Sequence, residues 1–240
     1  MTTNSRPPAA IRRRLRVRAA LMGVAALVLA SCADIKGDPQ TLPQDLINRA
    51  TETIDRFKTL PGLAAIKKHI ALARAVVVLP SVVKAGFIGA AEGGHGMLLV
   101  RDPSGRWSYP AFYTLGAASF GFQAGIQDTE VVLVLRSEKA LQAVLEHQGK
   151  FGADTGITVG FMGLGLEAST TANLGADVLA FANSKLGLYG GVSLEGAALV
   201  RRKDFNEAFY GPGATPRAIV LEGKFANPLA DGLRAALAAP

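Results

Sequence analysis

The chain has 240 residues, of which 49% are hydrophobic, and a formal net charge of +7. Residues 1–31 hold six arginines and no acidic side chain, so the rest of the chain carries 20 of the 26 basic side chains against all 19 acidic ones. A nearly neutral remainder lacks the charge that neutralises phosphates in nucleic-acid binding, and we therefore exclude nucleic acid as a partner. The apolar content suffices for one domain with a core.

Residues 1–31 have the three parts of a secretory signal peptide. A basic stretch at 12–18 precedes an apolar stretch at 19–30, and small residues follow. The apolar stretch of roughly 12 residues is shorter than the ~20 residues that a membrane-spanning helix needs. We therefore predict that this segment is cleaved.

The segment Leu29-Ala30-Ser31-Cys32 resembles the lipobox of bacterial lipoproteins, in which the cysteine receives a diacylglycerol group and becomes the new N-terminus. Cys32 is the only cysteine, so no disulfide can form within one chain. We predict a lipoprotein of the bacterial cell envelope, anchored through Cys32. Ala33 after the cysteine resembles the pattern for export to the outer membrane, where the domain would face the periplasm.

Residues 32–42 are predicted to be a polar tether, and residues 43–240 a single domain. An amphipathic helix is predicted from Pro43 to Leu60, because apolar residues recur at helical spacing in Leu46, Ile47, Ala50, Ile54 and Phe57. Its polar face mixes acidic and basic side chains. The stripe has two interpretations: it covers the domain core, or it lies among lipid headgroups.

A second short helix is predicted after Pro61-Gly62, with Lys67 and Lys68 on its polar face. Together with Arg74 these lysines form the more basic patch of the two helices. The period then changes: the run from Ala75 to Leu79 is β-branched and apolar and ends at Pro80, which is typical of a buried strand.

The chain from residue 80 to about residue 200 is predicted to consist mainly of strands. Turns are expected at 92–94 and 103–105, a continuous apolar strand at 131–135, and one helix at 138–146. Period-two alternation is expected to form strands at 120–126, 157–161, 166–174 and 186–199. A late strand is expected at 219–221, and a last helix contains Leu229, Leu233 and Leu237.

These patterns predict an α+β fold. Glycines inside the strand patterns indicate strong curvature. We expect a curved, mainly antiparallel, glycine-rich β-sheet or small barrel, with the N-terminal and internal helices packed on it.

Catalytic and metal-binding patterns are weak. Ser119 lacks the first glycine of a nucleophile elbow, and the Gly163-x-Gly165 pattern is followed by another predicted strand rather than by the helix that dinucleotide binding needs. His69, His95 and His147 are scattered and have no cysteine or carboxylate ligands at metal-binding spacing. Glu195 is more simply a structural hydrogen-bond partner than a base. We predict no enzyme activity, no cofactor and no metal.

Several motifs, in one order, resemble the Ysc84/SYLF family. They span roughly residues 60–211 and include Leu79-Pro80-Ser81-Val82-Val83-Lys84-Ala85-Gly86-Phe87 and Gly105-Arg106-Trp107-Ser108-Tyr109-Pro110-Ala111-Phe112. Further matching segments are 94–101, 119–126 with 131–135, 150–154, 187–199 and 209–211. The resemblance implies lipid binding and no reaction. Eukaryotic members bind phosphoinositides through an N-terminal amphipathic region and also engage actin, ligands that an envelope protein does not meet.

We therefore expect a non-enzymatic, phospholipid-binding envelope lipoprotein. Lys67, Lys68, Arg74 and Lys84 are the candidate headgroup contacts, and the membrane is bound in addition through lipidated Cys32. The alternative is a structural or adaptor lipoprotein that binds another envelope protein, with the lipid anchor giving only location.

Overall fold

A computed structural model of the protein describes residues 38–86, 89–120, 125–146, 157–163, 175–186 and 197–240. They belong to one compact unit, Asp38–Pro240, which contains both apolar cores described below. A unit with its own cores has what it needs to fold alone. Cys32, the predicted signal peptide and Glu195 lie outside the described residues.

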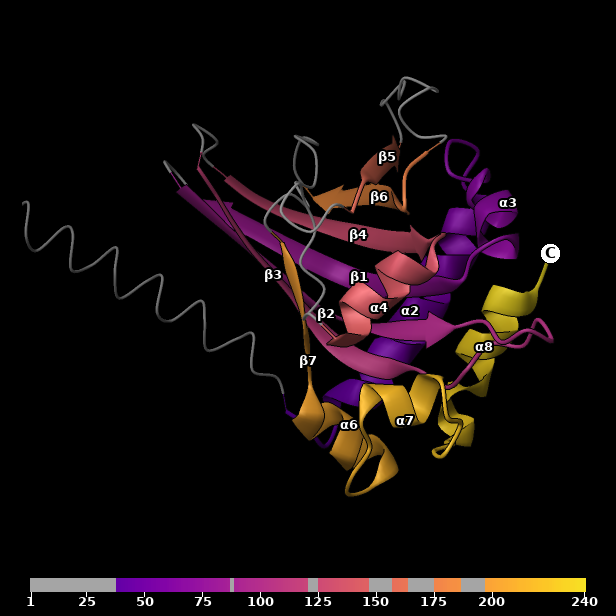
Figure 1. The fold of residues 1–240 in the computed structure, drawn as a ribbon. Helices are drawn as coiled ribbons and strands as arrows, with labels where there is room; N and C mark the ends of the chain where they lie inside the picture. Colours follow the sequence, from indigo (N-terminus) through magenta and orange to yellow (C-terminus); the bar gives the residue numbers. More distant parts are fainter. Residues whose placement is uncertain (1–37, 87–88, 121–124, 147–156, 164–174, 187–196) are drawn as a thin grey trace, which may run out of the picture. The chain divides into compact units, whose positions relative to one another are not determined.

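The centre of the fold is a seven-stranded sheet (Figure 1). Its strands are β1 (Ala75–Gly86), β2 (Gly89–Val100), β3 (Ala111–Phe120), β4 (Gly125–Leu135), β5 (Val159–Gly163), β6 (Val178–Leu186) and β7 (Ala198–Arg201). The spatial order is β5-β6-β4-β1-β2-β3-β7, and every pair is antiparallel except β5 with β6. The four central strands therefore have the Greek-key order, in which the fourth strand returns to the side of the first.

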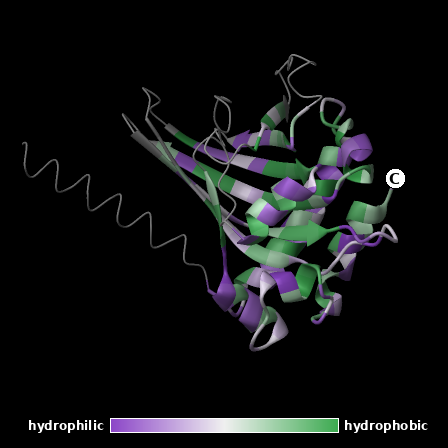
Figure 2. Ribbon diagram, viewed as in Figure 1, coloured by the Kyte–Doolittle hydropathy of each residue, from purple (hydrophilic) through white to green (hydrophobic). Residues whose placement is uncertain are grey.

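Helices cover both faces of this sheet. They are α2 (Leu42–Thr59), α3 (Ile66–Ala71), α4 (Glu138–Glu146), α6 (Lys203–Tyr210), α7 (Pro216–Val220) and α8 (Asp231–Ala238), with a 3₁₀ turn η2 (Pro228–Ala230) before the last. One core packs α4 and α7 on the sheet, and the other packs α2, α3, α6 and α8 on the opposite face. Figure 2 shows hydrophobic residues running through the helix-covered part of the sheet.

Strand β1 is buried on both faces, which is why its sequence does not alternate between apolar and polar residues. Val77 and Leu79 belong to one core, while Val76 and Val78 belong to the other. A strand that is buried on both faces has a continuous apolar run instead of period two.

A bulge in β1 explains the glycines of β2. The registers of β1 with both neighbours shift by one residue around Pro80 and Ser81, as expected for proline, which is tolerated in sheets at bulges. A Cβ atom on Gly94 would collide with the backbone oxygen of Ser81, and one on Gly96 with that of Val78. These glycines let two backbones approach closely and do not form a turn.

The structure confirms the α+β class, the mainly antiparallel sheet and the helix at 138–146. Of the two alternatives for the sheet, it is open: in the described residues β5 and β7 are its two edges and do not pair with each other. The expected turn at 103–105 is present, with Gly105 at φ +87°.

Three predictions were wrong. Residues 92–94 lie inside β2, where the absence of a side chain on Gly94 makes room for the Ser81 backbone at the bulge. Of the single strand expected at 120–126, Phe120 ends β3 and residues 125–126 begin β4, which is not its neighbour in the sheet, while residues 121–124 lie outside the described residues. Residues 219–221 do not form a strand: Thr215 caps α7 by accepting a hydrogen bond from the Ala218 backbone nitrogen, and the helix extends to Val220.

Two further predicted strands fall wholly or mostly outside the described residues. The strand expected at 166–174 lies outside the described residues. So does most of the strand expected at 186–199.

Candidate functional site

The apolar stripe of α2 belongs to the domain core. Leu46, Ile47, Ala50, Ile54 and Phe57 are each 0–3% exposed. Of the two interpretations of this helix, the structure therefore supports the core-covering one. Any lipid contact by the folded domain has to come from other residues.

The four candidate headgroup contacts do not form one cluster. Lys67 and Lys68 are exposed on α3. Arg74 lies in the loop before β1, where its Nε atom is 2.7 Å from the Glu138 carboxylate and its Nη1 atom donates to the Arg101 carbonyl. Lys84 lies near the far end of β1, so roughly 30 Å of extended strand separates it from Arg74.

Lys84 has a local role at its end of the sheet. It is paired in register with Glu92, which is 6% exposed. Burial raises the pKa of Glu92, and the Lys84 charge opposes that rise. Lys84 thus helps to keep a buried carboxylate ionised.

The corner around α3 (hereafter the α3 corner) combines charge with an exposed apolar side chain. It consists of Lys67, Lys68 and Leu72, the C-cap residue directly after α3. Leu72 is 82% exposed, the highest value among the exposed large hydrophobic side chains of the described residues. In the described part of the chain neither lysine has a carboxylate within 4.0 Å.

An open pocket of about 400 Å³ adjoins the α3 corner. It lies where α3, the end of β4, the start of α4 and the residues before β6 meet. Its lining consists of His69, Leu72, Arg136, Ser137, Gly175, Ala176 and Asp177.

The ionisable groups of the pocket affect one another. Burial lowers the pKa of His69, and the nearby Arg136 and Lys68 charges lower it further. Partial burial acts to raise the pKa of Asp177, but hydrogen bonds from Ser137 and Thr158 and the charge of Lys139 outweigh it and hold the pKa below its ordinary value. At neutral pH the pocket therefore contains a neutral imidazole, a guanidinium and a carboxylate.

Backbone and side-chain contacts hold these groups in place. The Arg136 backbone nitrogen donates to the Asp177 carbonyl oxygen at 2.8 Å. The backbone nitrogen and hydroxyl of Thr158 donate to the Asp177 carboxylate at 3.1 and 3.0 Å. The His69 ring packs against Phe181, with 5.6 Å between ring centroids. Sequence reasoning missed Arg136 and Asp177, because only the pairing of β4 with β6 brings them together.

A second polar cluster ties α2 to the sheet. Glu130 is 1% exposed on β4 and accepts hydrogen bonds from the Thr53 hydroxyl at 2.9 Å and the Asn183 amide at 2.8 Å. Lys185 and Arg56 lie 3.2 and 3.6 Å from the carboxylate. The one sequence signal for this cluster is the position of Glu130 directly before the continuous apolar run at 131–135. Because all of these contacts are internal to the fold, we assign this cluster a structural role.

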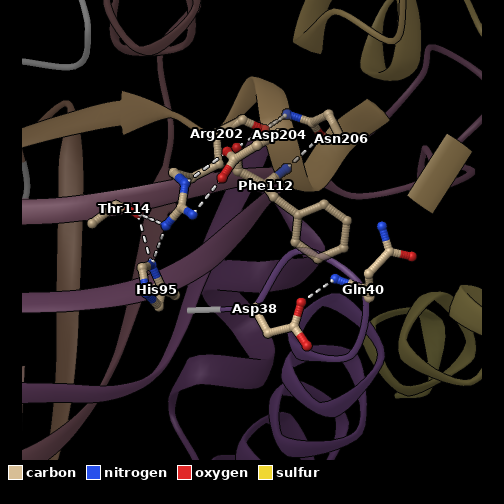
Figure 3. A network of polar contacts seen from close by, with 8 residues as sticks. All are labelled: Asp38, Gln40, His95, Phe112, Thr114, Arg202, Asp204 and Asn206. Carbon is tan, nitrogen blue, oxygen red and sulfur yellow. Dashed lines mark hydrogen bonds and ion pairs between the residues drawn. The ribbon is translucent and has the colours of Figure 1, made fainter. Parts of the chain in front are cut away.

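A third cluster joins α6 to the sheet (Figure 3). Nδ1 of His95 lies 2.7 Å from the Thr114 hydroxyl and 3.2 Å from Nη1 of Arg202, and Arg202 in turn pairs with Asp204 at 2.6 Å. The Arg202 guanidinium lies over the Phe205 ring, and Asn206 accepts a hydrogen bond from the Phe112 backbone. These contacts anchor α6 and leave the α3 corner as the candidate site.

The structure also locates the residues of the weak catalytic and metal-binding patterns. Ser119 lies within β3, opposite Ala90, and the next element that the structure describes is β4, not a helix. Gly163 ends β5, whereas Gly165 and His147 lie outside the described residues. Among the residues that the structure describes, no three His, Cys, Asp or Glu side chains gather as metal ligands, and no helix is long and apolar enough to cross a membrane.

Comparison with known proteins adds a family. The model of the family described as "Ysc84: Las17-binding protein actin regulator" matches residues 116–239. The "SH3 domain-containing YSC84-like protein 1" of Xenopus laevis is 36% identical over 160 residues, which are 66% of this chain and 47% of that protein. The human protein of the same name is 36% identical over 142 residues, 59% of this chain and 41% of its own length.

A yeast relative extends the similarity along the chain. The "LAS seventeen-binding protein 3" of Saccharomyces cerevisiae is 30% identical over 209 residues, which cover 85% of this chain and 40% of the yeast protein. The chain thus spans less than half the length of these relatives. The yeast protein is named for binding and the vertebrate proteins for an SH3 domain, and none of these names states a reaction.

Proposed function

The chain belongs to the Ysc84 family, and on that premise we propose that it is a non-enzymatic envelope lipoprotein whose domain binds phospholipid headgroups through the α3 corner. In this proposal Cys32 carries the lipid anchor, and the domain faces the periplasm from the outer membrane. Lys67 and Lys68 meet anionic headgroups while Leu72 enters the interface.

The observation that carries this proposal is the exposure of Leu72 beside two lysines without carboxylate partners among the described residues. An exposed leucine alone is common on protein surfaces. A leucine that projects beside lysines matches the composition of an interfacial membrane contact, in which the apolar group enters the headgroup layer and the cations meet lipid phosphates.

The expected strength of this contact suits an anchored protein. Each lysine near an anionic surface contributes about 1 kcal/mol, and burial of a leucine contributes about 2 kcal/mol. A total of roughly 4 kcal/mol corresponds to millimolar affinity. At millimolar lipid such a contact holds a fraction of the free domain on vesicles, and it can orient a domain that its lipid already holds at the membrane.

Flotation with vesicles tests the proposal. Asp38–Pro240, which lacks the anchor, is mixed with neutral or anionic phospholipid vesicles at low and moderate salt. We expect flotation with anionic vesicles at low salt, a loss with Lys67→Glu/Lys68→Glu, and a smaller loss with Leu72→Gln. Lys203→Glu/Lys224→Glu makes the same change in net charge on other exposed lysines and serves as the matched control.

Two results would count against this function. Absence of flotation under every condition would leave Cys32 as the sole source of membrane affinity. An equal loss in the control variant would reduce the effect to net charge. For the anchor itself, the mass of the mature chain isolated from a bacterial envelope should increase by a lipid modification that Cys32→Ser abolishes.

A protein partner is the second candidate function. The relatives are named for Las17 binding and for SH3 domains, so members of the family take part in protein contacts. Crosslinking of the anchored protein in envelopes separates the two functions. If a protein is still crosslinked to the Lys67→Glu/Lys68→Glu variant, the result favours an adaptor role, with the anchor supplying location.

A further inference from the structure

The pocket beside the α3 corner has a charge pattern that a purely anion-binding site would not have. Asp177 contributes a carboxylate to the same lining as Arg136. The two residues are neighbours across the ends of β4 and β6, because the Arg136 backbone nitrogen donates to the Asp177 carbonyl oxygen at 2.8 Å. A ligand in this pocket therefore meets a cation and an anion together.

Each charge suits one half of a zwitterion. A guanidinium carries five N–H donors in a fixed fork that matches phosphate oxygens, and it can bond a ligand and the protein simultaneously. Its Nη1 atom lies 3.4 Å from the Ala176 carbonyl oxygen. The Asp177 carboxylate is held by Thr158 at 3.0 and 3.1 Å and, with its lowered pKa, remains an acceptor for an ammonium group at neutral pH.

We propose that this pocket binds a phosphoester joined to a primary ammonium, with Arg136 contacting the phosphate and Asp177 the ammonium, and that the source of this group is the headgroup of an ethanolamine phospholipid. The inference rests on the proposed function, and it specifies the headgroup that the α3 corner reads. A volume of about 400 Å³ is within the range of small-ligand sites. Leu72 belongs to the same lining and is exposed, so it can contact the acyl chains of a bound lipid.

The lining also discriminates between headgroups. A quaternary ammonium, as in choline, has no N–H to donate to Asp177 and is typically recognised by aromatic side chains. His69 is the one ring among the described lining residues, and the Arg136 and Lys68 charges near it disfavour a second cation there. A headgroup with several phosphates would face repulsion from Asp177. A phosphoethanolamine group satisfies both partners, with its phosphate at Arg136 and its ammonium at Asp177.

The test compares vesicles of the same anionic fraction whose remaining lipid is either phosphatidylethanolamine or phosphatidylcholine. We expect Asp38–Pro240 to bind the ethanolamine vesicles about tenfold more tightly, the effect of one charge-assisted hydrogen bond. Asp177→Asn keeps an oxygen for Thr158, and it should remove the preference while leaving binding to the anionic component intact. Asp231→Asn, at an exposed ion pair elsewhere, should keep the preference.

Three results would overturn the inference. Equal binding to the two vesicle types excludes headgroup recognition. If the Asp177→Asn variant still prefers ethanolamine vesicles, the preference comes from the looser headgroup packing of those bilayers and not from the pocket. Chemical-shift changes at Arg136 and Asp177 on addition of free phosphoethanolamine, combined with equal binding to both vesicle types, would make the ligand a soluble one.

The proposed function fails by a different result, namely indifference to anionic lipid and to Lys67→Glu/Lys68→Glu. Arg136→Gln provides a second variant of the pocket. It should lower affinity for ethanolamine vesicles with a smaller effect on anionic choline vesicles. As a control, thermal unfolding of each variant should give a midpoint close to that of the wild type, as expected if the fold is retained.

Discussion

The Thr53 hydroxyl on α2 donates a hydrogen bond of 2.9 Å to the Glu130 carboxylate on β4, and both residues are at most 1% exposed. This contact joins the long N-terminal helix to the centre of the sheet through a buried charge. Burial of a carboxylate costs free energy unless its oxygens are paired. Here Asn183, Lys185 and Arg56 supply the remaining partners.

Replacement of Glu130 should therefore destabilise the domain strongly. We expect Glu130→Ala to lower the free energy of unfolding by about 3–5 kcal/mol, because it removes the carboxylate that pairs with Lys185 and leaves the Thr53 hydroxyl without its acceptor. Urea unfolding measures the change. Glu146→Ala, at a half-exposed ion pair with Arg217, should change stability by less than about 1 kcal/mol. Similar losses in the two variants would contradict the assigned role of Glu130.

Lys58 should hold the C-terminal helix. Its ammonium donates to the carbonyl of Ala236 at 2.7 Å and to that of Ala239, at the end of α8, and the residue is 7% exposed. Lys58→Met keeps the apolar stem and leaves these carbonyls without their donor, so we expect a loss of about 1–3 kcal/mol. Hydrogen exchange should show faster exchange in α8 first, whereas Lys224→Met should leave α8 unchanged.

Stability should depend on pH through His69. Burial, followed by the Arg136 and Lys68 charges, lowers its pKa below the ordinary value of 6.5. The unfolded ring then binds a proton more tightly than the folded one. The contribution of the neutral His69 ring to the free energy of unfolding is therefore fully present above pH 6.5. It is lost as pH falls from 6.5 through the folded pKa.

Titration of the His69 ring by NMR measures this shift directly. Across the same pH range, His69→Gln should make the unfolding free energy less sensitive to acid. A folded-state pKa at or above 6.5 would contradict the prediction.

Gly94 should not tolerate a side chain. A Cβ atom there meets the Ser81 backbone oxygen at the bulge, and backbone cannot move aside as a flexible side chain can. We expect Gly94→Ala to cost about 1–3 kcal/mol in unfolding free energy, the range for overpacked sites. Gly116→Ala, in β3 with no atom within 4 Å of the added carbon, should stay within about 0.5 kcal/mol of the wild type. Equal stability of the two variants would mean that the bulge relaxes freely.

The sequence by itself determined the parts of this protein that depend on near neighbours along the chain. The spacing of Leu46, Ala50, Ile54 and Phe57 predicted α2, and the apolar runs predicted the start of β1 and the end of β4. Periodicity carries such information because a helix or strand places residues a few positions apart on one face. The order of several motifs also indicated the family that comparison with known proteins shows.

Tertiary structure alone decided which distant residues meet. It placed Gly94, which was expected in a turn, where two strands approach closely, and it separated Lys84 from the lysines of α3 by the length of β1. It also brought Arg136 and Asp177 into one pocket and Glu130 under α2. Strand pairing between residues far apart in the chain sets these contacts, and no local spacing encodes that pairing.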